Sequence, residues 1–140
     1  MINALYRGKR ADNGEWVYGY YVKDVRSYGL VSNPSYREEH QIWYNKDNKQ
    51  VCAEVIPETV GQWTGMNDKD GIKIFEGDII ECDLYNAMVK IEHRKHLIIF
   101  ENGAFAIQWR IGNDKYSNYL HETWGRKIIG NIHDNFELLD

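Results

Sequence analysis

The chain contains little of what marks secreted, membrane-spanning or disulfide-bonded proteins. It has two cysteines among 140 residues, Cys52 and Cys82, and neither belongs to a CxxC pair. We therefore expect two reduced thiols in a cytoplasmic protein. No stretch approaches the roughly 18 apolar residues that a membrane span needs, and the first ten residues hold no apolar run. We expect neither a membrane segment nor a signal peptide.

Positive charge is not in excess either. The chain has 17 Lys and Arg against 21 Asp and Glu, a formal net charge of −4 at pH 7. This balance argues against a protein that binds nucleic acid by charge alone, and it leaves a local basic patch open.

Motifs for metal binding and catalysis are also missing. The histidines show no metal-site spacing with cysteine or carboxylate partners, so we expect no metal and no cofactor. They are His40, His93, His96, His121 and His133, and "HRKH" at 93–96 is interpreted as a solvated hairpin tip. The GxSxG, P-loop and GxGxxG motifs are absent, so we expect no enzyme. A Cys–His or Ser–His pair formed by folding stays open.

What the sequence does contain is alternation of apolar and polar residues. "AFAIQWRI" at 104–111 places Phe105, Ile107, Trp109 and Ile111 on one face, which predicts a half-buried strand. "ENG" before it predicts a turn that follows a strand at 96–100, and "MVKIEH" at 88–93 predicts the strand before that.

The N-terminal part repeats this pattern. Strands are predicted at 4–10 and 16–24 around Asn13-Gly14, and at 41–45 and 50–56 around "KDNK". A further strand is predicted at 127–133.

Helix is scarce. Helical spacing predicts one short helix at 113–124, and "SNPSYREEH" at 32–40 could open another, with Pro34 in its first turn. "PETVGQ" at 57–62 predicts a single turn. The expected fold is therefore mainly β (β-rich α+β): an N-terminal antiparallel sheet of hairpins, then a small barrel-like sheet with one short helix. We expect one domain over 1–140, with a subdivision into 1–56 and 57–140 as the alternative.

The acidic stretch from 64 to 83 raises two chemical hypotheses. If Gly71 is the sixth residue of a calcium loop, the first and twelfth are Met66 and Gly77, which are not ligands, so a turn is expected instead. Glu76 and Asp78 are two residues apart and could form an acid–base pair. The intervening glycine favours a turn into a strand, so catalysis here is our third hypothesis.

Two surfaces of the predicted N-terminal hairpin are candidate sites. Its basic residues adjoin aromatic ones, a combination that can hold single-stranded nucleic acid, although basic residues also discourage strand pairing at a sheet edge. The possible nucleic-acid contacts are Arg7, Lys9 and Arg10. The chain also has five Trp and ten Tyr, a surplus that suggests self-association. The candidates for that role are Trp16, Tyr18, Tyr20 and Tyr21.

Four segments together resemble the YopX-like family of phage and prophage proteins from Gram-positive bacteria. They are "RGKRADNGEWVYGYYV", "PETVGQWTGMNDKDGIKIFEGDII", "ENGAFAI" and "IIGNIHDNFELL", in this order. The chain departs from the family at Phe136, where a proline is common, and at His133, where an aromatic is common. The resemblance implies a small accessory protein in the bacterial host cytoplasm and supplies no catalytic residues.

Our expectation is a non-enzymatic interaction module that forms a homo-oligomer, with a host or phage protein as a further partner and no membrane contact. The alternative is a nucleic-acid-binding accessory protein that uses the N-terminal hairpin.

Overall fold

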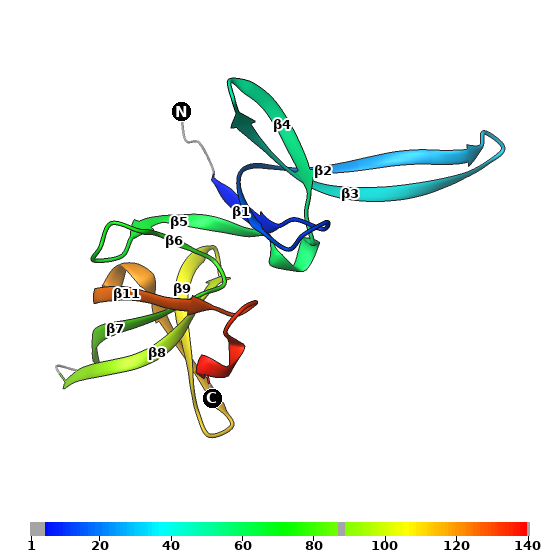
Figure 1. Ribbon diagram of the computed structural model, residues 1–140. Coiled ribbons are helices and arrows are strands. Elements are labelled where there is room, and N and C mark those ends of the chain that lie inside the picture. The colour runs from blue at the N-terminus through cyan, green and yellow to red at the C-terminus, as the bar shows by residue number, and fades with distance from the viewer. Residues whose placement is uncertain (1–4, 87–88, 140) are drawn as a thin grey trace. The chain divides into compact units, whose positions relative to one another are not determined.

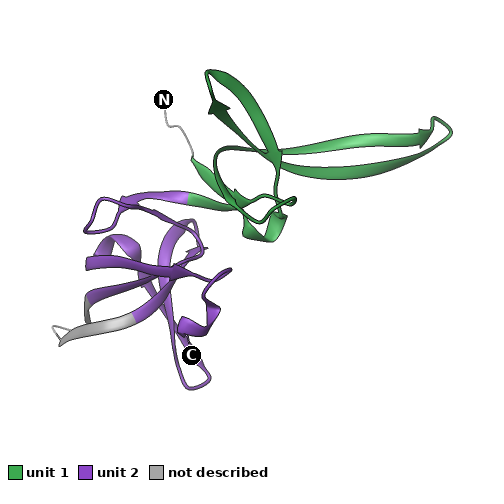
Figure 2. Ribbon diagram, in the orientation of Figure 1, with its two compact units in different colours: residues 1–62 green, residues 63–140 purple. Residues whose placement is uncertain are grey.

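The protein is built almost entirely of antiparallel strands (Figure 1). The computed structural model describes the backbone of residues 5–86 and 89–139 and the side chains of 5–83 and 95–139. Within these residues the helices are three short 3-10 turns, so the predicted mainly-β fold is confirmed. None of these helices is long or apolar enough to cross a membrane. The chain divides into two compact units, residues 1–62 and 63–140 (Figure 2).

The first unit is a sheet of hairpins. Its strands are β1 (Tyr6–Lys9), β2 (Trp16–Leu30), β3 (Asn33–Lys46) and β4 (Lys49–Glu54). They pair in the order β4-β3-β2-β1, and β1 also pairs with Gly61 and Gln62 at the start of β5 (Gly61–Asn67). The 3-10 turn η1 (Pro57–Thr59) confirms the single turn predicted there.

Turn residues with positive φ close these hairpins where the sequence predicts them. Gly14 has φ of 73°, and Asp47 and Asn48 have φ of 52° and 62°. Two successive positive φ angles produce the twist that a two-residue β-hairpin requires, and Asn, Asp and Gly adopt them at least cost. Ile42, Ala53 and Val55 are the buried apolar residues of this unit among those described.

The second unit holds a five-stranded sheet where the sequence predicts a small barrel-like one. Beyond the rest of β5, its elements are β6 (Lys73–Phe75), β7 (Asp78–Asn86), β8 (Val89–Glu101), β9 (Ala104–Ile111), β10 (Asp114–Tyr119), η2 (Leu120–Glu122), β11 (Thr123–Asn131) and η3 (Phe136–Leu139). The sheet has the order β10-β9-β8-β7-β11. Its core cluster is Ile74, Ile80, Cys82, Ile98, Ile107 and Leu120.

The helix predicted at 113–124 is wrong. Residues 114–119 form β10, which pairs with β9 from Asp114 opposite Ile111 to Tyr119 opposite Ala106. Gly112, with φ of 62°, turns the chain between the two strands. The Tyr116 ring stacks on Trp109 across the strands, with ring centroids 5.9 Å apart. This cross-strand contact outweighs the helical spacing because Tyr, Asn and Ser form helix weakly.

The short helix considered at 32–40 is also wrong. These residues belong to β3, which pairs along β2 from Tyr20 opposite Trp43 to Leu30 opposite Asn33. Pro34 stands near the tip, opposite Gly29. Long-range pairing overrides the local helix signal here.

The solvated hairpin tip predicted at 93–96 is wrong as well. β8 runs through it, and His96 pairs with Ile80 and is fully buried. The side chain of His93 lies outside the described residues. The charged residues of "HRKH" favour a turn, whereas the pairing of Arg94, Lys95 and His96 with β7 keeps the segment extended.

Candidate functional site

The most exposed apolar side chains of the first unit lie on the hairpin formed by β2 and β3. β1 pairs with β2 only as far as Gly19, and β4 pairs with β3 only from Gln41 onward. In the described pairings, residues 23–40 therefore form a ladder with each other alone, and we call this segment the outer ribbon. Figure 1 shows it extending away from β1 and β4.

Side chains alternate between the two faces of the β2–β3 hairpin, whose far part is the outer ribbon. One face, the tyrosine face, carries the even-numbered residues of β2 and their partners on β3. From β2 it presents Tyr18, Tyr20, Val22, Asp24, Arg26, Tyr28 and Leu30. Tyr28 is 60% exposed and Leu30 is 73% exposed, and Val31 at the tip is fully exposed. An isolated two-stranded ribbon is marginally stable in water, and this one leaves apolar side chains uncovered on one chain.

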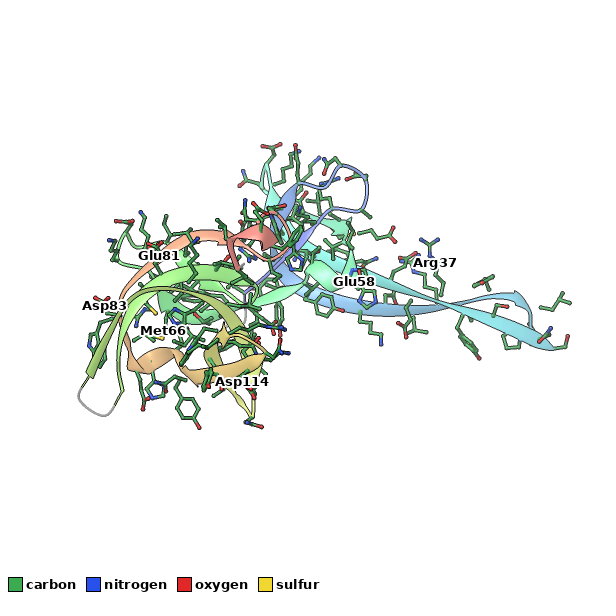
Figure 3. All side chains as sticks on the ribbon, turned by 90° about the horizontal axis from the view of Figure 1, so that it is seen from below. Arg37, Glu58, Met66, Glu81, Asp83 and Asp114 are labelled. Carbon is green, nitrogen blue, oxygen red and sulfur yellow. The ribbon has the colours of Figure 1, made fainter. Side chains whose placement is uncertain are left out.

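The middle of the tyrosine face is charged. Asp24 lies opposite Glu39, and Arg26 lies opposite Arg37, so an acidic row adjoins a basic row. Arg26 Nε donates to Asp24 Oδ2 at 2.9 Å and lies 3.7 Å from Glu39 Oε2. Arg37 is labelled on this hairpin in Figure 3. Its Nε lies 3.9 Å from Glu39 Oε1, and its Nη2 lies 3.3 Å from Glu54 Oε1.

The base of the tyrosine face contains an open hollow of about 320 Å³. Its lining is mainly aromatic and amide: Leu5, Tyr18, Gly19, Tyr20, Trp43, Tyr44, Asn45 and Gln50. Gly19 is one of the lining residues, and a Cβ atom there would lie 2.0 Å from the carbonyl oxygen of Trp43. Glycine is thus required by space at this position.

The four residues predicted for self-association divide into two pairs. Tyr18 and Tyr20 are 49% and 53% exposed, on the tyrosine face. Trp16 is half-buried, with the Arg7 guanidinium 4.6 Å and the Lys9 ammonium 5.5 Å from its ring centroid. Tyr21 is half-buried against Tyr6, and its hydroxyl lies 2.5 Å from His40 Nδ1. Trp16 and Tyr21 thus pack within the unit.

Sequence reasoning missed the outer half of this surface. The sequence predicts that the second strand ends at Asp24, and a short helix is considered at 32–40, so Tyr28 and Leu30 are not among the predicted candidates. The sequence signal is weak here, because the apolar residues of "VKDVRSYGL" stand at positions 22, 25, 28 and 30, which is not a period of two.

The three basic residues predicted to contact nucleic acid are engaged within the first unit. Arg7 is 6% exposed and lies over Trp16. Arg10 donates from Nε and Nη2 to the two carboxylate oxygens of Asp12, at 2.9 Å each, and from Nη1 to the Tyr44 hydroxyl at 3.1 Å. Asp12 thus offsets the charge of Arg10, and burial limits the access of a phosphate to Arg7.

The carboxylates of the acidic stretch hold turns in the second unit. Asp78 is 2% exposed, and its Oδ2 accepts from the backbone N–H of Phe75 at 2.8 Å, across Gly77 with φ of 92°. Glu76 beside it is half-buried. This geometry gives Asp78 a structural role in the turn that the sequence predicts.

Asp68 ties the neighbouring loop to β11. Its Oδ1 accepts from the backbone N–H of Asp70 and Ile72 at 2.9 and 3.0 Å, and its Oδ2 accepts from Ile128 N–H at 3.2 Å. Burial pushes the pKa of Asp68 upward, but these backbone donors outweigh it and hold the pKa below its usual value. Asp70 forms an ion pair with Lys127. Among the described residues, no three His, Cys, Asp or Glu side chains gather as a metal site would need.

Folding does bring one cysteine and one histidine together. Cys82 Sγ lies 3.5 Å from His96 Nδ1, and the His96 ring meets Trp109 edge to face at 5.2 Å. Burial, aided by the charge of Asp83, raises the pKa of Cys82 to about 12. A nucleophilic cysteine needs its thiolate, so this buried pair is suited to core packing.

Comparison with known proteins identifies the family of the chain. The crystal structure of protein EF1440 from Enterococcus faecalis is similar at 20% sequence identity over 100% of both chains, with a TM-score of 0.47. None of the curated proteins compared with the chain matches it. The family model described as YopX protein matches residues 5–140. Because this match spans almost the whole sequence, the chain belongs to the YopX family.

Proposed function

We propose that this protein is a non-enzymatic interaction module that self-associates through the tyrosine face of the β2–β3 hairpin. The observation that carries the proposal is the run of exposed apolar side chains on a two-stranded ribbon that has no further strand beside residues 23–40 in the described pairings. Burial of apolar surface contributes about 25 cal/mol per Å², so covering these side chains would favour association.

The candidate chemical groups support a non-enzymatic role. Asp68 and Asp78 accept backbone hydrogen bonds, and the thiol of Cys82 is buried with a raised pKa. These groups therefore stabilise turns and core. An origin in a phage or prophage and a place in the bacterial cytoplasm belong to the proposal through the family resemblance alone, as does a host or phage protein as an additional partner.

Light scattering after size exclusion tests the proposal directly. The monomer mass is 16.5 kDa. We expect twice that mass or more at about ten micromolar, falling toward the monomer at sub-micromolar concentration, the range that a micromolar Kd implies. A monomer mass throughout would contradict the proposal.

A shortened hairpin provides the matched control. Residues 23–40 are replaced by Asn-Gly, a two-residue turn that connects Val22 to Gln41, which already face each other across the two strands. This variant should fold and remain monomeric at ten micromolar. If it associates as the wild type does, the ribbon is not the interface.

Nucleic-acid binding through Arg7, Lys9 and Arg10 remains the alternative. It predicts a mobility shift of single-stranded DNA at low salt that is lost when all three are replaced by Glu. The burial of Arg7 and the pairing of Arg10 with Asp12 weigh against it. The absence of a shift with wild-type protein would remove this alternative.

A further inference from the structure

We infer that two copies of this chain pack tyrosine face to tyrosine face, with their ribbons antiparallel, so that the acidic row of each copy faces the basic row of the other. This inference rests on the proposed self-association and specifies its geometry. The two-fold axis crosses the ribbon between the row of Asp24 and Glu39 and the row of Arg26 and Arg37.

The charged rows are the first observation. Like charges directly opposite each other on neighbouring strands are destabilising. Here two such pairs stand side by side, Asp24 with Glu39 and Arg26 with Arg37, and the ion pairs within the ribbon run between the rows. A second copy turned end for end places opposite charges over both rows at once.

Symmetry then decides the orientation. A two-fold axis along the ribbon would place each charged row over the same row of the second copy, acid on acid and base on base. Contact between like charges is unfavourable. An axis across the ribbon places β2 over β2 with reversed direction. Asp24 then faces Arg26 of the second copy on β2, and Glu39 faces Arg37 of the second copy on β3 in the same way. Closed two-fold pairing of this kind is the commonest oligomeric arrangement.

The same operation matches the apolar residues. It places Val22 near Tyr28 of the second copy and Tyr20 near Leu30 of the second copy, because both pairs are equally distant from the axis. The tip of each ribbon then reaches the aromatic hollow at the base of the other. Exposed apolar residues thus meet at both ends of the interface while charges meet at its centre.

The area of the face suits a stable dimer. Rows 20 to 30 extend about 33 Å at 3.3 Å per residue. Tyr20 and Tyr28 in these rows, with Tyr18 next to them, are about half exposed and together contribute roughly 300 Å², since one aromatic buries 150–250 Å² when covered. With Val22, Leu30 and the charged rows, each copy offers on the order of 700–800 Å², close to the ~800 Å² per partner of a specific interface.

The opposite face of the ribbon lacks this pattern. Lys23 pairs with Glu38 in the same copy at 3.2 Å, and Val25 and Tyr36 lie among polar neighbours. It has no adjacent acidic and basic rows, so the end-for-end operation brings no matching charges together. Lys23 and Glu38 therefore provide matched controls.

Charge exchange between two variants tests the geometry. Variant one carries Asp24→Lys and Glu39→Lys, and variant two carries Arg26→Glu and Arg37→Glu. Each alone should dimerise at least ~100-fold more weakly than wild type, because like charges then face each other across the interface. An equimolar mixture should restore heterodimers to within about tenfold of the wild-type Kd, measured by light scattering and by pull-down of a tagged variant.

Controls separate the outcomes. The exchange Lys23→Glu with Glu38→Lys, on the opposite face, should leave the dimer Kd unchanged within threefold, and circular dichroism establishes that every variant is folded. If wild type is monomeric, both this inference and the proposed function fail. If wild type is dimeric and each variant dimerises as well as wild type, the interface lies elsewhere and self-association stands.

A distance measurement provides the second readout. Val31→Cys is spin-labelled in a Cys52→Ser background, where buried Cys82 does not compete for the label. Antiparallel ribbons place the two tip labels ~40 Å apart, about twelve residues at 3.3 Å each. Dipolar spectroscopy that gives ~40 Å supports the arrangement, and a separation below ~20 Å, as tip-to-tip packing requires, would overturn it.

Discussion

The core of the second unit and the outer ribbon of the first unit use their apolar side chains in opposite ways. In the second unit Ile74, Ile80 and Ile107 are fully buried in a common cluster. In the first unit Tyr28 and Leu30 project from the outer ribbon and are mostly exposed. The hydrophobic effect has the same strength per area in both places, and in the core of the second unit it stabilises the fold. The ribbon leaves that free energy available for association.

Because of this difference, substitutions in the two regions should change different measured quantities. A change in the second core should appear in the free energy of unfolding, whereas a change on the ribbon should appear in the dissociation constant of the proposed dimer. The following predictions test this separation.

The largest contrast concerns the two cysteines, one in each unit. Cys52 is exposed and Cys82 is buried. Because the pKa of Cys82 is raised to about 12 from 9.0, its thiolate fraction at pH 8 is ~10³-fold below that of an ordinary thiol. A thiol reagent should therefore label one cysteine per native chain and both in urea. Equal labelling rates in the native state would contradict the burial of Cys82.

Truncation in the second core should have the next largest effect. Ile80→Ala removes a fully buried side chain and leaves a cavity, so the free energy of unfolding should fall by about 2–5 kcal/mol in urea titrations. Ile72→Ala, at a 56% exposed position of the same unit, is the control and should change it by less than ~0.5 kcal/mol. Similar losses for both would mean that the core is not where the structure places it.

Replacing Asp68 should cost less and should alter the pH dependence. Asp68→Asn weakens the acceptor for three backbone N–H groups, which predicts a loss of about 1–3 kcal/mol at pH 7. The folded-state pKa of Asp68 is lowered, so its contribution is fully present above the ordinary carboxyl value near 3.8. It disappears as the pH falls through the lower folded value.

Urea titrations from pH 7 to pH 2.5 measure this linkage. Wild type should lose more stability than Asp68→Asn over the acidic part of the range. The control Asp70→Asn, which alters the exposed ion pair with Lys127, should follow the wild-type profile closely. Parallel curves for wild type and Asp68→Asn would exclude the proposed role.

The smallest predicted effect lies on the ribbon. Leu30→Ser should weaken the dimer about tenfold and leave the unfolding of the dilute monomer unchanged, because Leu30 is 73% exposed within one chain. Ile111→Ser, on a 52% exposed apolar residue of β9, is the matched control and should not affect association. Equal effects of the two substitutions would place the interface outside the tyrosine face.

Local turn chemistry explains what the sequence predicted well. Asn13-Gly14 and Asn102-Gly103 lie where the chain reverses, and Asn102 and Gly103 have φ of 53° and 78°. Few residue types adopt these angles at low cost, so the Asn-Gly sequence itself predicts the turn. Alternation then locates the strands on either side.

Long-range pairing explains what the sequence did not predict. Residues 114–119 have helical spacing, and only their pairing with β9 makes them a strand. Alternation also defines two faces without showing which one is covered. Tyr20 and Tyr21 therefore looked equivalent, although Tyr21 packs against Tyr6 and Tyr20 faces solvent. The surplus of aromatics predicts an interface without placing it. The position of the proposed interface depends on how far β1 and β4 extend along the β2–β3 hairpin.

The close approach of the backbone at Gly19 has a genetic consequence. Gly19 is needed because the carbonyl oxygen of Trp43 occupies the space of a Cβ atom, and a backbone oxygen cannot turn aside as a flexible side chain can. Every substitution at the first or second base of a glycine codon introduces a side chain or a stop. Codon 19 should therefore tolerate only silent third-base changes, and a library randomised there and selected for folded protein should return glycine.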